Sequence, residues 1–373
     1  MNNKIFFVYS GTQGTAGLYL SPILNCLSAI KVDCYAFTSF YYPFDNASRW
    51  FFKLTDLANG KKKKWLRPYL RYVELCWGLF RVLIKCVIIR PAFINYSLNT
   101  CYFSEYLFLL CITKILRIPI VITCHDVAPF ENAYVSNDTE MKRRKIIFHL
   151  AKYLLVHNEY SKEVLTTMFH INREKIVSHR FPVMDLTIIN DQVVGKSVDF
   201  LFIGHLRKEK GIDILLNAWG EFHKRFPEAT LCIAGNVPAN HAIDTAAYDR
   251  LNVTFYMEYM SDDEYIRLIK TARCVVLPYT KGTNSGIPSS ACSVNTQVIT
   301  SNLPMFMENE LVDKRYVFRN GDVEDLVDKM RLMYMSHCAK RRTDDRIDSL
   351  ILSDYRQAFI NEVQSLYRTL IIS

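Results

Sequence analysis

The chain has 373 residues, half of them hydrophobic, and a formal net charge of +9. Because a single core seldom grows beyond ~250–300 residues, this length favours two domains, and the hydrophobic content excludes a largely disordered chain. The 11 cysteines form no Cys-x-x-Cys pair and no His/Cys ligand spacing. This pattern argues against disulfides and a metal site and favours a cytoplasmic protein.

The first half of the sequence alternates short apolar runs with helical patterns. Strands are predicted over residues 5–9, 33–37, 93–97, 119–124, 153–157 and 175–178, and helices over residues 18–29, 141–150 and 161–168. Repeated strand–helix units imply a parallel sheet covered by helices on both faces. The longest apolar stretches, 73–90 and 106–123, are interrupted by basic residues, so no transmembrane helix is expected.

A polar stretch over residues 185–197 is typical of a linker, and the alternation restarts after it. Strands are predicted over residues 199–203, 230–234, 253–256, 274–277, 297–300 and 316–318, and helices over residues 212–225, 262–271, 323–335 and 354–371. Ser261 and Glu264 form a capping box at the second of these helices. The sequence therefore predicts two doubly wound α/β domains, and ligands bind such sheets at the carboxyl ends of the strands.

The segment over residues 200–211 joins a predicted strand to a predicted helix through a charged loop. The strand ends at Gly204, and His205, Arg207 and Lys210 follow before the helix begins. Unpaired amides and the helix dipole attract an anion at such a place, and a lysine adds a full charge. We therefore expect Lys210, helped by His205 or Arg207, to bind a diphosphate. A solvated charged turn is the alternative.

The loop over residues 279–291 is rich in small residues and follows another predicted buried strand. Pro288 suits the first turn of a helix, where its missing N–H costs nothing. Asn284, Ser285 and Gly286 place amides and hydroxyls at the start of that helix. The loop therefore predicts a second anion site at the same edge of the sheet. An ordinary capped loop is the alternative.

His125 and Asp126 end a predicted buried strand of the first half. An imidazole beside a carboxylate at this edge suits proton transfer or the binding of a hydroxyl, whereas a loop histidine with a structural role is the alternative. The glycine loop over residues 11–14 follows the first predicted strand and is only a weak dinucleotide fingerprint. The loop that begins at Gly235 also belongs to a carboxyl edge.

A cluster of basic and aromatic residues lies over residues 61–72. It includes Lys61, Lys62, Lys63, Lys64, Trp65 and Arg67. An anionic lipid surface attracts such a segment by ~1 kcal/mol per basic residue, and aromatic side chains sit at headgroup level. Nucleic acid would also attract it, but no recognition module is visible. We expect peripheral contact with an anionic membrane, with a solvated basic loop as the alternative.

In this order, these blocks resemble the glycosyltransferases of the GT-B fold, most closely family 4, the glycosyl transferases group 1. The family's Gly-Arg-Leu-x-x-Glu-Lys-Gly-(Ile/Val)-Asp is similar to Gly204-His-Leu-Arg-Lys-Glu-Lys-Gly-Ile-Asp213, and its P-x-A-x-L-x-I-x-G to Pro227-Glu-Ala-Thr-Leu-Cys-Ile-Ala-Gly235. The resemblance is strong over residues 198–325 and weaker before them. It implies two Rossmann-like domains facing a cleft, an acceptor-binding, membrane-facing domain over 1–185 and a nucleotide-sugar domain over 198–353. A helix over 354–373 would cross back to the first domain.

The resemblance also implies roles for single residues. Lys210 should bind the donor diphosphate, Gly14 and His125 should lie near the donor, and Gly286 and Ile287 should offer backbone amides to the phosphate. The full set of expected donor-binding residues is Gly14, Gly204, His205, Arg207, Lys210, Gly235, Asn284, Ser285, Gly286, Ile287 and Ser290.

The sequence departs from the family at two places. The family's loop arginine is replaced by His205, and the two glutamates spaced E-x7-E fall on Gly282 and Ser290, so both are missing. In the family the second glutamate holds the nucleotide ribose and the first contacts the donor sugar. Their absence leaves the donor and the stereochemical outcome open.

We therefore expect a cytoplasmic glycosyltransferase, peripheral on the inner face of the cell membrane, that uses a nucleoside-diphosphate sugar and needs neither a metal nor another cofactor. The acceptor is expected to be a polyprenyl-diphosphate-linked glycan of bacterial surface polysaccharide biosynthesis. His125, Asp126 and Lys210 are the catalytic candidates, with Asp126 as the base if the sugar configuration inverts. An inactive GT-B protein that binds glycans or partners, and a nucleotide-sugar epimerase of the same fold, are the alternatives.

Overall fold

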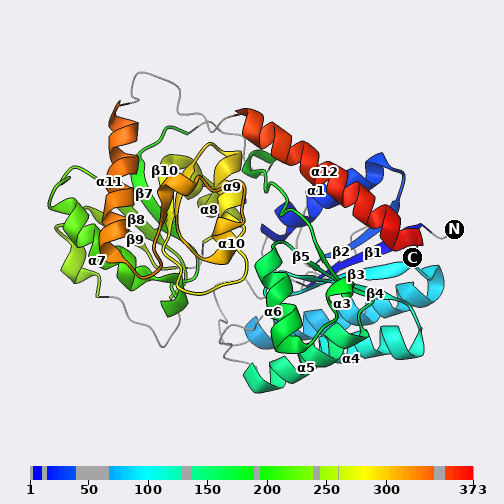
Figure 1. Cartoon of the computed structure of the whole chain (residues 1–373). Coiled ribbons are helices and arrows are strands. Elements are labelled where there is room, and N and C mark those ends of the chain that lie inside the picture. The colour runs from blue at the N-terminus through cyan, green and yellow to red at the C-terminus, as the bar shows by residue number, and fades with distance from the viewer. Residues whose placement is uncertain are drawn as a thin grey trace. The chain divides into compact units, whose positions relative to one another are not determined.

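The protein forms two compact units, each built around its own sheet (Figure 1). The computed structural model describes residues 3–10, 15–38, 67–127, 137–188, 194–237, 244–258, 260–339 and 349–372. Unit 1 comprises Met1–Pro182 and Ala358–Ser373, and unit 2 comprises Val183–Gln357. Each unit contains a six-stranded sheet whose strands are all parallel, and this confirms the predicted α/β class.

The sheet of unit 1 has the strand order β2-β1-β3-β4-β5-β6. Its strands are β1 (Lys4–Tyr9), β2 (Asp33–Thr38), β3 (Phe93–Leu98), β4 (Ile120–Cys124), β5 (Tyr153–Val156) and β6 (Ile176–Ser178). All six strands predicted in the first half are confirmed to within a residue at each end. Their near-continuous apolar runs are typical of strands that are buried on both faces of a parallel sheet.

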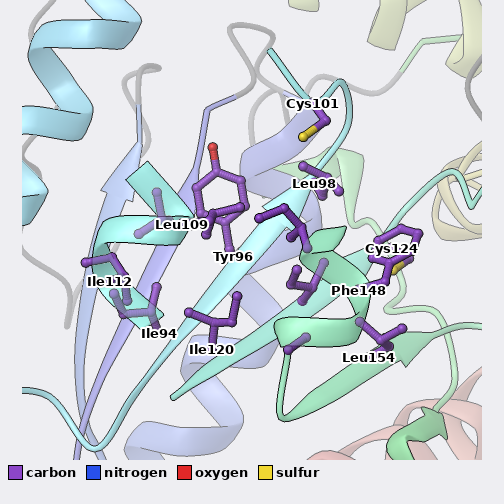
Figure 2. Packing of buried hydrophobic residues seen from close by; sticks show 14 of the residues in the cluster. Ile94, Tyr96, Leu98, Cys101, Leu109, Ile112, Ile120, Cys124, Phe148 and Leu154 are labelled. Carbon is purple, nitrogen blue, oxygen red and sulfur yellow. The ribbon is translucent and has the colours of Figure 1, made fainter. Parts of the chain in front are cut away.

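Helices cover both faces of this sheet (Figure 1). One face packs against α3 (Arg67–Ile89), α4 (Phe103–Leu110), α5 (Asn137–Leu150) and α6 (Glu159–Phe169). Figure 2 shows part of that core, where Tyr96 and Ile120 from the strands meet Leu109 and Phe148 from the helices. The other face carries α1 (Thr15–Ala29) and the end of α12 (Ser349–Ile372).

Helix α12 runs from unit 2 into unit 1, and its second half packs on the unit 1 sheet. The Tyr367 ring lies 5.7 Å from that of Phe7 and 6.3 Å from that of Phe93. Its hydroxyl accepts a hydrogen bond of 2.6 Å from the side chain of Asn95. Because Tyr367 is fully buried, this helix supplies part of the core of unit 1.

The sheet of unit 2 has the strand order β12-β11-β10-β7-β8-β9. Its strands are β7 (Val198–Ile203), β8 (Leu231–Ala234), β9 (Val253–Tyr256), β10 (Ala272–Leu277), β11 (Gln297–Ser301) and β12 (Val317–Phe318). Its helices are α7 (Ile212–His223), α8 (Asp262–Thr271), α9 (Ile287–Ser293), α10 (Pro304–Met307) and α11 (Val323–Ala339). The order reverses between β7 and β10, so this pair is the switch point where doubly wound sheets bind ligands.

The core of unit 2 lies between its sheet and the pair α7 and α11. Trp219 and Phe222 from α7 and Met330 from α11 pack on Phe200 of β7. On α8, the predicted capping box is confirmed: the Ser261 hydroxyl accepts from the Glu264 amide at 3.2 Å, and the Glu264 carboxylate accepts from the Ser261 amide at 2.9 Å.

Two helical segments of unit 1 lie in the long apolar stretches of the sequence, for which no helix bounds were predicted. These are α3 and the pair formed by α4 and the π-helical turn η2 (Cys111–Ile115). Both show apolar residues on more than one side, which blurs the amphipathic period on which such predictions rest. Among the described residues, no helix is both long enough and apolar enough to cross a membrane.

Candidate functional site

The carboxyl ends of β7 and β10 bring the two predicted anion loops together in unit 2. The strands are paired in parallel, so both loops leave the same edge of the sheet. The amide of Thr280 donates to the Glu209 carbonyl at 2.9 Å, which joins the loop after β10 to the loop after β7. Two segments about 70 residues apart in the chain therefore form one continuous surface.

Glycines permit this close approach. Gly211 has φ +69°, and a Cβ there would lie 1.8 Å from the Pro278 carbonyl oxygen. Gly235, which follows β8, has φ +155°, and its Cβ would lie 1.6 Å from the Gly204 carbonyl oxygen. Both distances exclude any side chain. The glycines of the resembled motifs therefore serve backbone packing at the edge of three neighbouring strands, β8, β7 and β10.

Lys210 lies in the middle of this surface. It ends a short 3-10 turn, Lys208–Lys210, and its ammonium nitrogen is 3.7 Å from the centroid of the Tyr279 ring. Tyr279 is 2% exposed, and its carbonyl accepts from the Ser301 hydroxyl at 2.6 Å. A rigid aromatic face therefore holds the lysine charge at the β7–β10 edge through a cation–π contact.

Arg207 and His205, the two residues expected to help Lys210, have different environments. Arg207 lies 3.8 Å from the Glu209 carboxylate, which partly balances its charge. His205 has an exposed side chain, and its pKa is lowered by partial desolvation and by the charges of Arg207 and Lys210. His205 is therefore neutral at pH 7, and the positive charge of the loop is carried by Arg207, Lys208 and Lys210.

The start of α9 lies beside this loop, since a Cβ on Gly204 would be 4.0 Å from Ile287 Cδ1. The Asn284 side chain accepts from the Ser285 amide at 2.9 Å, so that amide is already used. In the described part of the chain, the amides of Gly286 and Ile287 have no acceptor. Of the amides expected to face a phosphate, these two are the ones that remain available.

Ser290 lies differently from the other predicted donor residues. It is completely buried on α9, and its amide donates to the Gly286 carbonyl at 3.0 Å. Direct contact with a donor is therefore not expected of its side chain. Gly282, at the position of the other missing glutamate, has φ +155° and packs against Met305. No carboxylate occupies residues 278–293.

In unit 1, His125 lies at the carboxyl end of β4 and is enclosed by aromatic rings. Its ring is 4.5 Å from that of Tyr19 and 5.5 Å from that of Tyr9. Burial and the neighbouring His179 lower its pKa to about 4, so it is neutral at pH 7. Its Nε2 atom is buried without a hydrogen-bond partner among the described residues. Such a nitrogen suits a hydroxyl of a bound ligand.

Two further histidines extend this group into a row. His125, His157 and His179 follow β4, β5 and β6, which are neighbours in the sheet. The His157 ring lies 6.0 Å from that of His125 and 4.7 Å from that of His179. The Tyr19 hydroxyl lies 3.1 Å from His157 Nε2. Sequence reasoning missed the row, although a histidine directly after each of three successive strands was the signal.

This row makes the stability of the protein pH-dependent. The pKa of His179 is about 4 and that of His157 is well below 6.5, in both cases chiefly because of burial. Unfolded histidines titrate near ~6.5. Between pH ~6.5 and ~4 the unfolded chain therefore binds protons that the folded chain does not, and the free energy of unfolding falls as the pH falls.

Urea unfolding between pH 7 and 5 should show this loss of stability. His179→Asn, which keeps a donor for the Arg180 carbonyl, should reduce the slope by ~1.4 kcal/mol per pH unit. An unchanged slope would contradict the assignment.

A buried arginine, Arg144, binds the backbone of the loop that carries His125 and Asp126. Arg144 of α5 is 1% exposed and donates to the Asp126 carbonyl at 2.6 Å and to the Asn99 carbonyl. Its guanidinium also pairs with the Glu140 carboxylate at 2.6 Å. The pair fixes the loops after β3 and β4. Sequence reasoning did not find it, although Glu140 and Arg144 have the i, i+4 spacing of a helical ion pair.

The remaining predicted residues lie outside the described part of the chain. These are Gly14, Lys61, Lys62, Lys63, Lys64 and Trp65. Arg67 begins α3, and only its backbone is described. Among the described residues, no group of three or more His, Cys, Asp or Glu is placed to hold a metal ion.

Two doubly wound parallel sheets, one with a lysine at its switch point, define a two-unit Rossmann-like protein. Residues 187–345 match the family described as glycosyl transferases group 1. This match confirms, over residues 187–345, the resemblance inferred from the sequence. No curated protein sequence matches the chain.

Solved structures show the same GT-B fold over the whole chain. TarM aligns with a TM-score of 0.65 at 10% identity, covering 100% of this chain and 99% of TarM. The structure described as trehalose-6-phosphate from E. coli bound with UDP-2-fluoro glucose aligns with 0.62 at 11% identity, covering 99% and 98%. UDP-GlcNAc 2-epimerase from Neisseria meningitidis bound to UDP-GlcNAc aligns with 0.56 at 14% identity, covering 99% and 100%. At these identities the likeness concerns the fold.

Proposed function

We propose that the protein transfers a sugar from a nucleoside-diphosphate sugar to a hydroxyl acceptor. The observation that carries the proposal is the Lys210 ammonium group, held 3.7 Å from the Tyr279 ring at the β7–β10 edge. It lies within the segment that matches the group 1 glycosyl transferases. Two of the structural matches are bound to UDP-sugars, which supports a donor of this class.

The chemistry follows from where charge develops. As the bond between the sugar and the β-phosphate breaks, its electrons pass to the diphosphate, and the acceptor oxygen forms the new bond to the sugar. Lys210 and the amides of Gly286 and Ile287 stabilise the charge on the leaving diphosphate. Because these groups already supply positive charge, we propose that no metal is required. Activity should then persist in excess EDTA.

Unit 1 is proposed to bind the acceptor. The unpartnered Nε2 of His125 offers a hydrogen bond to a hydroxyl. Asp126 takes the acceptor proton if the sugar configuration inverts. If the configuration is retained, the acceptor proton passes to an oxygen of the leaving diphosphate, and Asp126 orients the substrate. The proposed acceptor is a polyprenyl-diphosphate-linked glycan of bacterial surface polysaccharide synthesis. The site is then cytoplasmic and peripheral to the inner face of the membrane.

A thermal-shift panel identifies the donor. Nucleoside diphosphates and their sugars are added to the purified protein at increasing concentration. A ligand at ~100 times its dissociation constant stabilises the folded state by ~2.7 kcal/mol, which gives a visible rise in Tm. We expect the rise with a nucleoside diphosphate but not with its nucleoside. No rise with any diphosphate would contradict the proposal.

The epimerase alternative is kept because a nucleotide-sugar epimerase is among the structural matches. An epimerase changes the donor without an acceptor, whereas a transferase releases nucleoside diphosphate and forms a glycoside. Mass spectrometry and chromatography of the donor after incubation without acceptor separate the two. Neither product would appear if the missing glutamates had left an inactive binding protein.

A further inference from the structure

Helix α3 exposes a continuous apolar stripe. Eight large side chains along it are 42–69% exposed, namely Tyr69, Tyr72, Val73, Trp77, Phe80, Ile84, Val87 and Ile88. Their spacing of three or four residues places them on one side of the helix. Leu79, Val82 and Cys86 point instead into the core of unit 1. The helix is therefore apolar on two sides, and unit 1 covers only one of them.

The stripe continues onto the neighbouring helix. Helices α3 and α4 lie side by side in unit 1 (Figure 1), and the rings of Tyr72 and Tyr102 are 6.4 Å apart. Phe103 and Leu107 of α4 are 52% and 44% exposed, and Ile115 of η2 is 72% exposed. We call the exposed apolar residues of α3, α4 and η2 the α3 face. An apolar patch that spans two helices is larger than the scattered exposed residues of an ordinary surface.

Within the described segment that carries the α3 face, the exposed charges have one sign. Residues 71–117 contain six basic side chains, Arg71, Arg81, Lys85, Arg90, Lys114 and Arg117. The same range contains two acidic residues, Glu74 and Glu105, whose side chains are buried at 2% and 1% exposure. The surface of this segment therefore presents positive charge without an exposed carboxylate. Helical spacing puts Arg81 and Lys85 along one border of the apolar stripe.

We propose that the α3 face binds an anionic lipid bilayer, with α3 lying parallel to the membrane plane at the depth of the headgroups. The combination of an apolar stripe, basic borders and aromatic residues such as Tyr69 and Trp77 is what such a surface requires. A second copy of the chain fits less well, because pairing two α3 faces would bring like charges together. The inference gives the proposed membrane contact its surface, and it does not require transferase activity.

Co-sedimentation with vesicles tests the inference on the full chain without donor or acceptor. One set of vesicles is pure phosphatidylcholine, and the other is phosphatidylcholine with one third phosphatidylglycerol. We expect at least tenfold stronger binding to the anionic vesicles, reduced by raising the salt concentration. Equal binding to both sets, or none, would overturn the proposal.

Paired substitutions locate the surface. Phe80→Ser with Ile84→Ser should lower anionic-vesicle binding at least tenfold. Arg81→Gln with Lys85→Gln removes two charges worth ~1 kcal/mol each, which corresponds to about thirtyfold weaker binding. The matched control is Leu332→Ser with Met335→Ser on α11, where both residues are similarly exposed at 48% and 54%. It should bind like the wild type.

Three readouts keep the outcome decisive. Circular dichroism and Tm show whether each variant folds, and a folded Phe80→Ser/Ile84→Ser variant that sediments like the wild type overturns the proposal. Brominated lipids should quench the fluorescence of Trp77, measured as the difference between the wild type and Trp77→Phe. Absence of this quenching overturns the proposal.

If light scattering shows that the wild type is a dimer and that Phe80→Ser/Ile84→Ser dissociates it, a second copy of the chain covers the α3 face instead. Vesicle binding without transferase activity contradicts the proposed function alone.

Discussion

Lys210→Ala should lower the rate of sugar transfer by ~10²–10³ while leaving the fold intact, because it removes one group that stabilises developing charge. The side chain is half-buried and contacts the Tyr279 ring from above, so its loss opens no core cavity. Initial rates at saturating acceptor, with the donor found in the thermal-shift panel, measure the effect. Tm should change by no more than for an ordinary surface substitution.

The matched control for this variant is Lys208→Ala. Lys208 belongs to the same 3-10 turn, carries the same charge and is exposed. If general positive charge attracted the donor, both substitutions would lower the rate alike. If position matters, only Lys210→Ala should have a large effect. Equal rates for Lys210→Ala and the wild type would show that the lysine at the switch point does not serve the reaction.

Arg144→Met should destabilise the protein by ~3–5 kcal/mol, because it leaves the carboxylate of Glu140 buried without its partner. Glu140 is 1% exposed, and Arg144 also satisfies the carbonyls of Asp126 and Asn99. Urea unfolding at pH 7 measures the loss as a shift of the midpoint at constant slope. Lys145→Met, an exposed lysine next in the helix, is the control and should be nearly neutral.

A double-mutant cycle separates the ion pair from the rest of the arginine's contacts. Glu140→Gln removes the buried charge, so Arg144→Met added to it should cost clearly less than Arg144→Met alone. The remaining cost reports the lost hydrogen bonds to the loop carbonyls. Strict additivity of the two substitutions would contradict a coupled pair between Arg144 and Glu140.

The order of strands along the chain was predictable because each is a short apolar run between turn residues. Sheet order was less accessible, since the placement of β10 beside β7 depends on contacts between residues far apart in sequence. The bounds of helix α3 were not predicted, for a physical reason. Its outward side is apolar like its inward side, so the period that marks a surface helix is absent.

The same contrast holds at the candidate site. Lys210 and the glycines could be predicted from the sequence, because the spacing of residues in a motif reflects local backbone geometry. The cation–π contact of Lys210 with Tyr279 and the hydrogen bond from Thr280 to Glu209 could not be predicted, because they join loops about 70 residues apart. The histidine row depends on the pairing of β4, β5 and β6, and the clamp by Arg144 depends on how α5 packs. Strand pairing and helix packing cannot be predicted from the local sequence, because both depend on residues far apart in the chain.

Hydrogen–deuterium exchange with bound nucleoside diphosphate tests the central claim most directly, because it shows which backbone amides the ligand protects. Peptides over residues 204–211 and 278–290 should exchange more slowly in the presence of the diphosphate, and these peptides should be unaffected by the corresponding nucleoside. The protection should be lost in Lys210→Ala and kept in Lys208→Ala. If a diphosphate that raises Tm left both peptides unprotected, the anion would bind elsewhere, and the β7–β10 edge would not be the donor site.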